Sequence, residues 1–227
     1  MKLNIGKSDA ELKADVLSEL KAEPRVKITD IGVLVKEGTV TLNGYASSYG
    51  EKFAAVQSAK RVAGVKAIAD DIQIKLPDSS HRTDGDIANA AANQINWTAM
   101  IPKGTTEVTV REGWITLEGE VEWWYEKNAA ENAVHHLTGV KGVTNLIKIK
   151  PKPASEDIES IMKNSFERNA LLEARNIQVE TSENKVVLRG RVQNYTEREE
   201  AERIAWSTPG VLSVDNQLDV EWFWGEE

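Results

Sequence analysis

The sequence contains no cysteine among its 227 residues. This absence excludes disulfide bonds, thiol nucleophiles and cysteine-ligated zinc or iron–sulfur centres together. Long apolar runs are also missing, because no stretch approaches the roughly 18–20 residues that would span a bilayer. We therefore expect no transmembrane segment.

The N-terminus, MKLNIGKSDAELKADVL, lacks the apolar core of a signal peptide. As written, the chain is expected to be cytoplasmic. A periplasmic protein whose signal peptide had been removed would look similar, so this alternative stays open.

Residues typical of catalytic centres are scarce. The three histidines are His81, in a linker, and the adjacent pair His135 and His136, on a predicted helix. Adjacent helical side chains diverge by about 100°, which makes a shared metal difficult. No Ser-His-Asp order, phosphate-binding loop or HExxH pattern is present. We expect a protein that is not an enzyme and has no cofactor and no metal site.

What the chain does contain is one pattern written three times. The strings VTLNGYA, ITLEGEV and VVLRGRV place a glycine at the same point of a predicted strand, at Gly44, Gly119 and Gly190. A second glycine follows each of them after 20 residues, at Gly64, Gly139 and Gly210. A turn residue that follows glutamate precedes each strand glycine by six positions, at Gly38, Gly113 and Asn184. Three columns in register indicate a tandem repeat.

Each repeat reads as helix, strand, strand, helix, strand. The first helices begin with capping-box pairs, Ser8 with Glu11 and Thr83 with Asp86, and the strands alternate with period two. The predicted fold class is α+β, with three tandem αββαβ modules, each a small three-stranded sheet covered on one face by two helices. The predicted modules span residues 8–76, 83–150 and 155–220.

The strand glycines are predicted to be structural. They fall on the apolar, inward face of the second strand, where a side chain would hold the covering helix away. A second recurring column, Asp70, Asn145 and Asn216, is also interpreted as structural, because these side chains readily bond to nearby backbone.

The repeated motifs resemble the BON domain, a small bacterial module. The resemblance rests on the strand glycine in TVTLNGYA, WITLEGEV and VVLRGRV, followed by AGVKAIADDI, TGVKGVTNLI and PGVLSVDNQL, and it covers residues 8 to 220. It implies a link with osmotic and envelope stress and no catalytic residue. Among similar proteins it implies anionic phospholipid binding, assistance to folding, or potassium sensing.

Charge argues against nucleic acid as a partner. The net charge is −8, and basic and acidic residues number 12 and 10 in residues 1–76, 7 and 10 in 77–150, and 9 and 16 in 151–227. No basic stripe is present, whereas phosphate binding depends on clustered lysine and arginine. A lipid surface is less easily dismissed, because Lys13, Lys21, Arg25 and Lys27 lie near the first predicted helix.

Seven tryptophans are many for this length. Trp114 and Trp124 are expected to pack inside the second module. Five others form the candidate partner surface: Trp97, Trp123, Trp206, Trp222 and Trp224. Two interpretations of these five remain open, which are packing between modules and a binding surface, where tryptophan is enriched.

Two functional hypotheses follow. The first is a non-enzymatic, stress-related binding protein that engages a protein or an envelope phospholipid partner through surface complementarity. The alternative is an intracellular potassium (K⁺) sensor that uses backbone carbonyl ligands, which no sequence motif would reveal.

Overall fold

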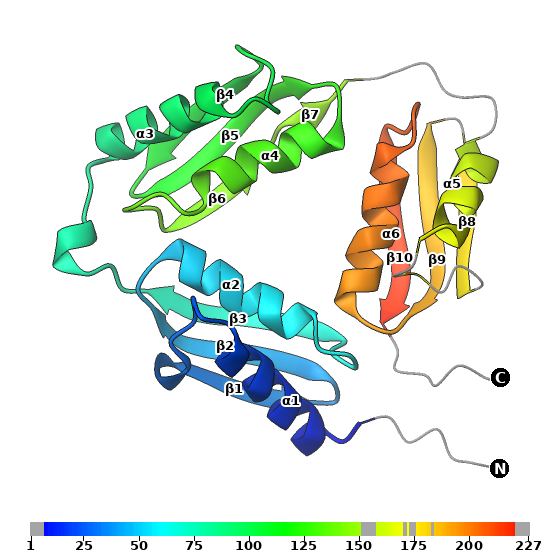
Figure 1. Cartoon of the computed structure of the whole chain (residues 1–227), viewed down its shortest axis with the longest axis horizontal. Coiled ribbons are helices and arrows are strands. Elements are labelled where there is room, and N and C mark those ends of the chain that lie inside the picture. The colour runs from blue at the N-terminus through cyan, green and yellow to red at the C-terminus, as the bar shows by residue number, and fades with distance from the viewer. Residues whose placement is uncertain (1–6, 151–157, 170–171, 173–175, 183, 221–227) are drawn as a thin grey trace. The chain divides into compact units, whose positions relative to one another are not determined.

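The computed structural model describes residues 7–150, 158–169, 172, 176–182 and 184–220. It contains three α+β modules, each with two helices on one face of its sheet (Figure 1), as the sequence predicts. Module 1 comprises α1 (Asp9–Ala22), β1 (Ile31–Lys36), β2 (Thr39–Ala46), α2 (Tyr49–Lys60) and β3 (Ala67–Ile74). Two short 3₁₀ turns, Ile28–Asp30 and Asp78–Ser80, lie before β1 and after β3.

Modules 2 and 3 repeat this order. Module 2 comprises α3 (Asp84–Trp97), β4 (Thr106–Arg111), β5 (Trp114–Val121), α4 (Trp124–Val134), β6 (Gly142–Asn145) and β7 (Lys148–Ile149). Module 3 comprises α5 (Ile158–Glu167), β8 (Ile177–Ser182), β9 (Lys185–Val192), α6 (Tyr195–Ser207) and β10 (Ser213–Val220).

The second strand of each module lies at the centre of its sheet. It pairs antiparallel with the first strand, and in modules 2 and 3 it pairs parallel with the last. A parallel neighbour requires a crossover, which the second helix of the module supplies. In module 2 the last strand is divided into β6 and β7, which both pair with β5.

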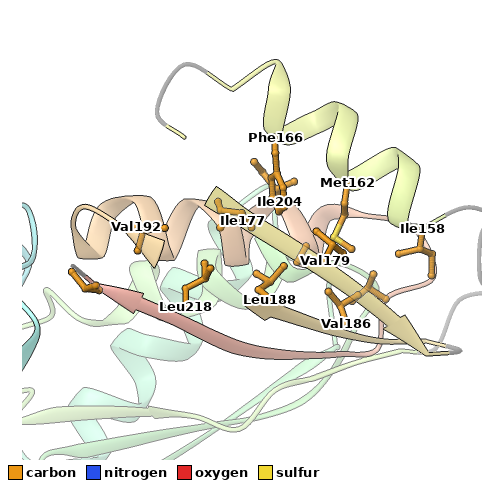
Figure 2. Close-up of a cluster of buried hydrophobic side chains, with 14 residues drawn as sticks. Ile158, Met162, Phe166, Ile177, Val179, Val186, Leu188, Val192, Ile204 and Leu218 are labelled. Carbon is orange, nitrogen blue, oxygen red and sulfur yellow. The ribbon is translucent and has the colours of Figure 1, made fainter. Parts of the chain in front are cut away.

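Helical spacing explains how each core is built. In α5, Ile158, Met162 and Phe166 recur every four residues and lie on the face turned toward the sheet (Figure 2). They meet alternate residues of the central strand, including Val186 and Leu188. Module 2 has the same arrangement, with Ile87, Ala91 and Ile95 of α3 packed with Ile115 and Leu117 of β5.

The three strand glycines have similar surroundings, but the prediction that they make room for the covering helix is wrong. Their φ angles are 109°, 132° and 123° for Gly44, Gly119 and Gly190, a region that L-residues rarely adopt. A Cβ atom at each would overlap the backbone carbonyl oxygen of the residue before the module's first strand, namely Asp30, Thr105 and Asn176. Glycine therefore allows close approach of the neighbouring backbone within the sheet, not of the covering helix.

An aspartate ties the first helix to the hairpin turn. The Asp84 carboxylate, at the start of α3, accepts hydrogen bonds from the N–H groups of Glu112 (2.8 Å) and Gly113 (2.8 Å). Both turn residues have positive φ, 53° and 80°, as type I′ turns require. In module 1, Asp9 accepts in the same way from Glu37 and Gly38.

Each side chain of the Asp70, Asn145 and Asn216 column accepts a hydrogen bond from the backbone N–H two residues later, at 3.2, 3.3 and 3.3 Å, as predicted. The two asparagines also bond to the second helix of their modules. Asn145 Nδ2 donates to the Lys127 carbonyl oxygen of α4 (2.9 Å) and to Glu131 Oε2 (3.2 Å). Asn216 makes the equivalent bonds to Arg198 and Glu202 of α6. The two asparagines thus fasten the second helix to the last strand in modules 2 and 3.

Candidate partner-binding surface

The exposed face of α3 carries very little charge. After Asp84 and Asp86 in the first turn of α3, the sequence from Ile87 to Thr106 has one charged residue, Lys103, whereas the equivalent residues 12–31 of module 1 have eight. Beyond the first turn of α3, the outward side chains are amides and alanines, and they end in an aromatic ring: Asn89, Ala90, Asn93, Asn96 and Trp97. Depletion of charge is the compositional mark of the centre of protein interfaces.

Trp97 and Met100 are the most exposed large apolar side chains among the described residues. Trp97 is 80% exposed and Met100 is 60% exposed. Trp97 is the last residue of α3, and Met100 follows in the loop that leads to β4. Two large apolar groups are therefore exposed to water at the uncharged C-terminal end of α3.

The loop after α3 is held in one conformation by its own hydrogen bonds. Thr98 caps the helix, because its N–H and its Oγ1 both donate to the Gln94 carbonyl oxygen, at 3.1 and 2.8 Å. The Ile101 N–H then donates to the Thr98 carbonyl oxygen (3.0 Å), and the Ile101 side chain is buried in the module core. Trp97 and Met100 thus extend from a backbone that is fixed on both sides.

Module 1 provides an internal comparison for this loop. Its backbone makes equivalent bonds. The Glu23 N–H donates to the Leu20 carbonyl oxygen (3.3 Å), as the Thr98 N–H does to that of Ile95 (3.2 Å), and the Val26 N–H donates to the Glu23 carbonyl oxygen (3.1 Å), as the Ile101 N–H does to that of Thr98. The positions equivalent to Trp97 and Met100 are occupied by Ala22 and Arg25. The large apolar side chains are therefore not required by the loop.

We call the exposed set in module 2 the α3 surface. It consists of Asn89, Asn93, Asn96, Trp97, Met100 and Lys103, all exposed. Sequence reasoning identified Trp97 and missed Met100. The signal for Met100 was available in the near absence of charge along α3 when it is compared with α1.

Trp206 and Trp123, the other described members of the predicted set, are less exposed than Trp97. Trp206 is half-buried and packs against the core of its own module. Trp123 is half-buried at the N-cap of α4, where its backbone N–H donates to Glu126. Trp222 and Trp224 lie outside the described residues. Trp114, which was expected to pack in its module, does so only in part, because its ring lies against Gly142 and is 50% exposed.

Metal-binding side chains are not gathered anywhere in the described part of the chain, where no three His, Asp or Glu residues are placed to hold an ion. Partial burial, and next the neighbouring His136, lower the pKa of His135 and favour its neutral form. The hypothesis of a potassium sensor concerns backbone carbonyl groups and stays a prediction. Among the described residues, no helix has the length and apolar content needed to cross a membrane.

Comparison with known proteins places the three repeats in one family. Residues 8–75, 83–151 and 154–221 each match the BON domain. Osmotically-inducible protein Y of Escherichia coli (strain K12) is 29% identical over 146 residues, which make up 63% of this chain and 73% of that protein.

Two solved structures of CdsD, a structural protein of the type III secretion system of Chlamydia trachomatis, also match. One is 12% identical, with 94% of this chain and 99% of that chain covered, and the other is 11% identical, with 90% of each covered. The TM-score is 0.25 in both comparisons.

Proposed function

Because the chain belongs to the BON domain family, we propose that it is a non-enzymatic, stress-related binding protein that docks a protein partner on the α3 surface. The observation that carries the proposal is the 80% exposure of Trp97 at the uncharged C-terminal end of α3. The relation to stress is supported by the name of its Escherichia coli relative, which is osmotically inducible.

The chemistry of the α3 surface favours a protein over a lipid headgroup. Binding to an anionic membrane needs several basic residues beside the apolar ones. The α3 surface offers one, Lys103. The other members of the α3 surface besides Trp97 are Asn89, Asn93, Asn96 and Met100. Their amide and thioether side chains suit a protein partner that supplies backbone hydrogen-bonding groups and apolar side chains.

The fixed loop favours tight binding through a small interface. Ordering flexible side chains and loops on binding costs free energy, and a preformed surface avoids part of that cost. Tryptophan at the centre of an interface typically contributes about 2 kcal/mol or more when truncated. Methionine beside it adapts its shape to the partner.

The test exchanges the α3 surface for its module 1 counterpart. The double variant Trp97→Ala/Met100→Arg installs the residues found at Ala22 and Arg25, on a loop with the same hydrogen bonds. Proteins that co-purify with the wild-type chain under osmotic stress are identified and purified. Each Kd is then measured by calorimetry with both forms of the chain.

We expect the double variant to fold with an unchanged melting temperature and to lose affinity for its partner by roughly 30-fold or more, since 2 kcal/mol corresponds to that ratio. Substitution of exposed residues usually changes stability little, so the melting temperature shows whether a loss of affinity comes from the α3 surface or from misfolding. Equal affinity of both forms would contradict the proposal. Binding to anionic phospholipid vesicles that is abolished by the same double variant would assign the surface to lipid instead.

A further inference from the structure

A second aromatic surface lies on the face of the module 2 sheet that the helices leave open. Along β5, Ile115, Leu117 and Val121 are buried in the core. Trp114 has the opposite parity and points away from the helices, and it is 50% exposed. This ring takes no part in the α3 surface.

The Trp114 ring is held in place on its sheet. Its Nε1 donates to Thr144 Oγ1 at 2.8 Å. A Cβ atom on Gly142, the residue opposite Trp114 in the parallel pair of β5 and β6, would overlap ring atoms Cε3, Cζ3 and Cη2. One side of the ring therefore lies against the Gly142 backbone, and the other side faces water as a fixed flat platform.

The platform is specific to module 2. In module 3 the equivalent site holds Lys185 and Asp215, which form an ion pair at 3.6 Å. In module 1 the positions equivalent to Trp114 and Thr144 hold Thr39 and Ala69. Neither module has an aromatic ring at this place, so the sheet does not need one for its own stability.

Polar side chains form two rows beside the Trp114 ring, one on β4 and one on β5, on the same face of the sheet. The antiparallel register of β4 and β5 places Arg111 opposite Trp114, then Thr109 opposite Thr116, then Glu107 opposite Glu118. Alternate residues on a strand are about 7 Å apart. A ligand that covers the ring is therefore within reach of hydroxyl and then carboxylate groups, all on rigid strands.

We propose that this open face binds a glycan, with one pyranose stacked on Trp114 and the following sugars hydrogen-bonded to the threonine and glutamate rows. A pyranose has an apolar C–H face, which matches an aromatic plane, and a rim of hydroxyls, which match Thr and Glu. The indole N–H is already used by Thr144, so the ring offers a stacking plane rather than a donor. The paired carboxylates disfavour an anionic ligand, because they would repel it.

The experiment follows the Trp114 indole N–H by NMR in the full chain during titration with oligosaccharides. The probes are N-acetylglucosamine, cellulose-type and amylose-type tetrasaccharides, each up to about 10 mM, so that a millimolar Kd is detected. We expect at least one of them to shift the Trp114 indole signal and to leave that of Trp97 unchanged.

Variants distinguish stacking from a general surface effect. Trp114→Ala is expected to weaken binding by roughly three- to tenfold or more, as aromatic stacking predicts, whereas Trp114→Phe retains part of the affinity. Gly142→Ala keeps the tryptophan and displaces its ring, so it too should lower the affinity. Trp97→Ala serves as the matched control and should bind the glycan as the wild type does.

The proposal is overturned if none of the three sugars shifts the Trp114 signal, or if Trp114→Ala binds as tightly as the wild type. It is also overturned if a lysine-rich peptide shifts this signal and the sugars do not. Each of these failures would leave the α3 surface untouched, because the two sites lie on different elements and are tested with different ligands.

Discussion

Gly119 lies against the carbonyl group of Thr105, so closely that a Cβ atom would overlap the oxygen. The same oxygen accepts a hydrogen bond from the Glu120 N–H at 3.1 Å. Because Gly119 has no side chain, Thr105, the residue before β4, can approach β5 closely enough to make this hydrogen bond. Gly44 with Asp30 and Gly190 with Asn176 repeat the relationship.

Gly119→Ala should destabilise module 2 by about 2–4 kcal/mol, because it adds a steric overlap to an unfavourable φ of 132°. Gly104→Ala is the matched control, since its φ is 74° and no atom lies within 4 Å of its added Cβ. It should cost about 1–2 kcal/mol, from φ alone. Urea unfolding of the full chain measures both, and equal losses would contradict the role of Thr105.

Asp84→Asn should destabilise module 2 by about 1–2 kcal/mol. The substitution weakens two charge-assisted hydrogen bonds to Glu112 and Gly113 and removes a negative charge from a helix N-terminus. Glu118→Gln makes the same change of charge on the open sheet face, and should alter stability by less than about 0.5 kcal/mol. Thermal unfolding of the two variants compares them. A similar loss in both would show that overall charge is responsible.

The capping box of α3 should make stability depend on pH in the acid range. The Thr83 hydroxyl, and next its backbone N–H, donate to Asp86 and hold the pKa of that carboxyl below its ordinary value of 3.8. A carboxyl with a lowered pKa stabilises the folded state fully above its unfolded-state pKa and loses this effect as pH falls through its folded-state pKa.

Asp86→Asn is therefore expected to be less stable than the wild type at neutral pH, with a difference that shrinks as the pH falls below 3.8. Chemical denaturation at a series of pH values measures this. Thr83→Ala, which removes the donor instead, should show the same trend. A difference that stays constant down to the most acid pH would refute the linkage.

Asn145→Asp should destabilise module 2 by about 1–3 kcal/mol, because a carboxylate cannot donate to the Lys127 carbonyl oxygen and repels Glu131. Adding Glu131→Val should recover part of the loss, since module 1 carries Asp70 and Val56 at the two equivalent positions. A double-mutant cycle measures the coupling, expected at about 0.5–2 kcal/mol. Strict additivity would show that the two side chains act independently.

Much of the fold could be predicted because its determinants recur in the sequence. Period-four apolar residues in helices and period-two residues in strands place the cores, and the capping boxes at Ser8 and Thr83 set two helix starts, as the structure confirms. The turn residues Gly38 and Gly113 have the positive φ that their position predicts.

Other features could not be predicted from the sequence, because they depend on residues that are brought together only in the fold. The pairing of the last strand with the second depends on contacts distant in sequence, so the strand order could not be read. The strand glycine was attributed to helix packing because the alternation of the strand places it on the inward face. Its positive φ and the carbonyl group beside it can be seen only in the structure. The outward position of Trp114 could have been predicted, because Trp114 and Thr116 are alternate residues of one strand and so lie on the same face of the sheet.

The bond between Asp84 and the turn at Glu112 and Gly113 has a consequence for how module 2 opens. Amides in an exposed hairpin turn normally exchange with solvent through local fraying. Here the amides of Glu112 and Gly113 are instead held by the Asp84 side chain, 28 residues away from Glu112 in sequence. These two amide hydrogens should therefore exchange more slowly in the wild type than in Asp84→Ala, because the carboxylate links the tip of the hairpin to the first turn of α3.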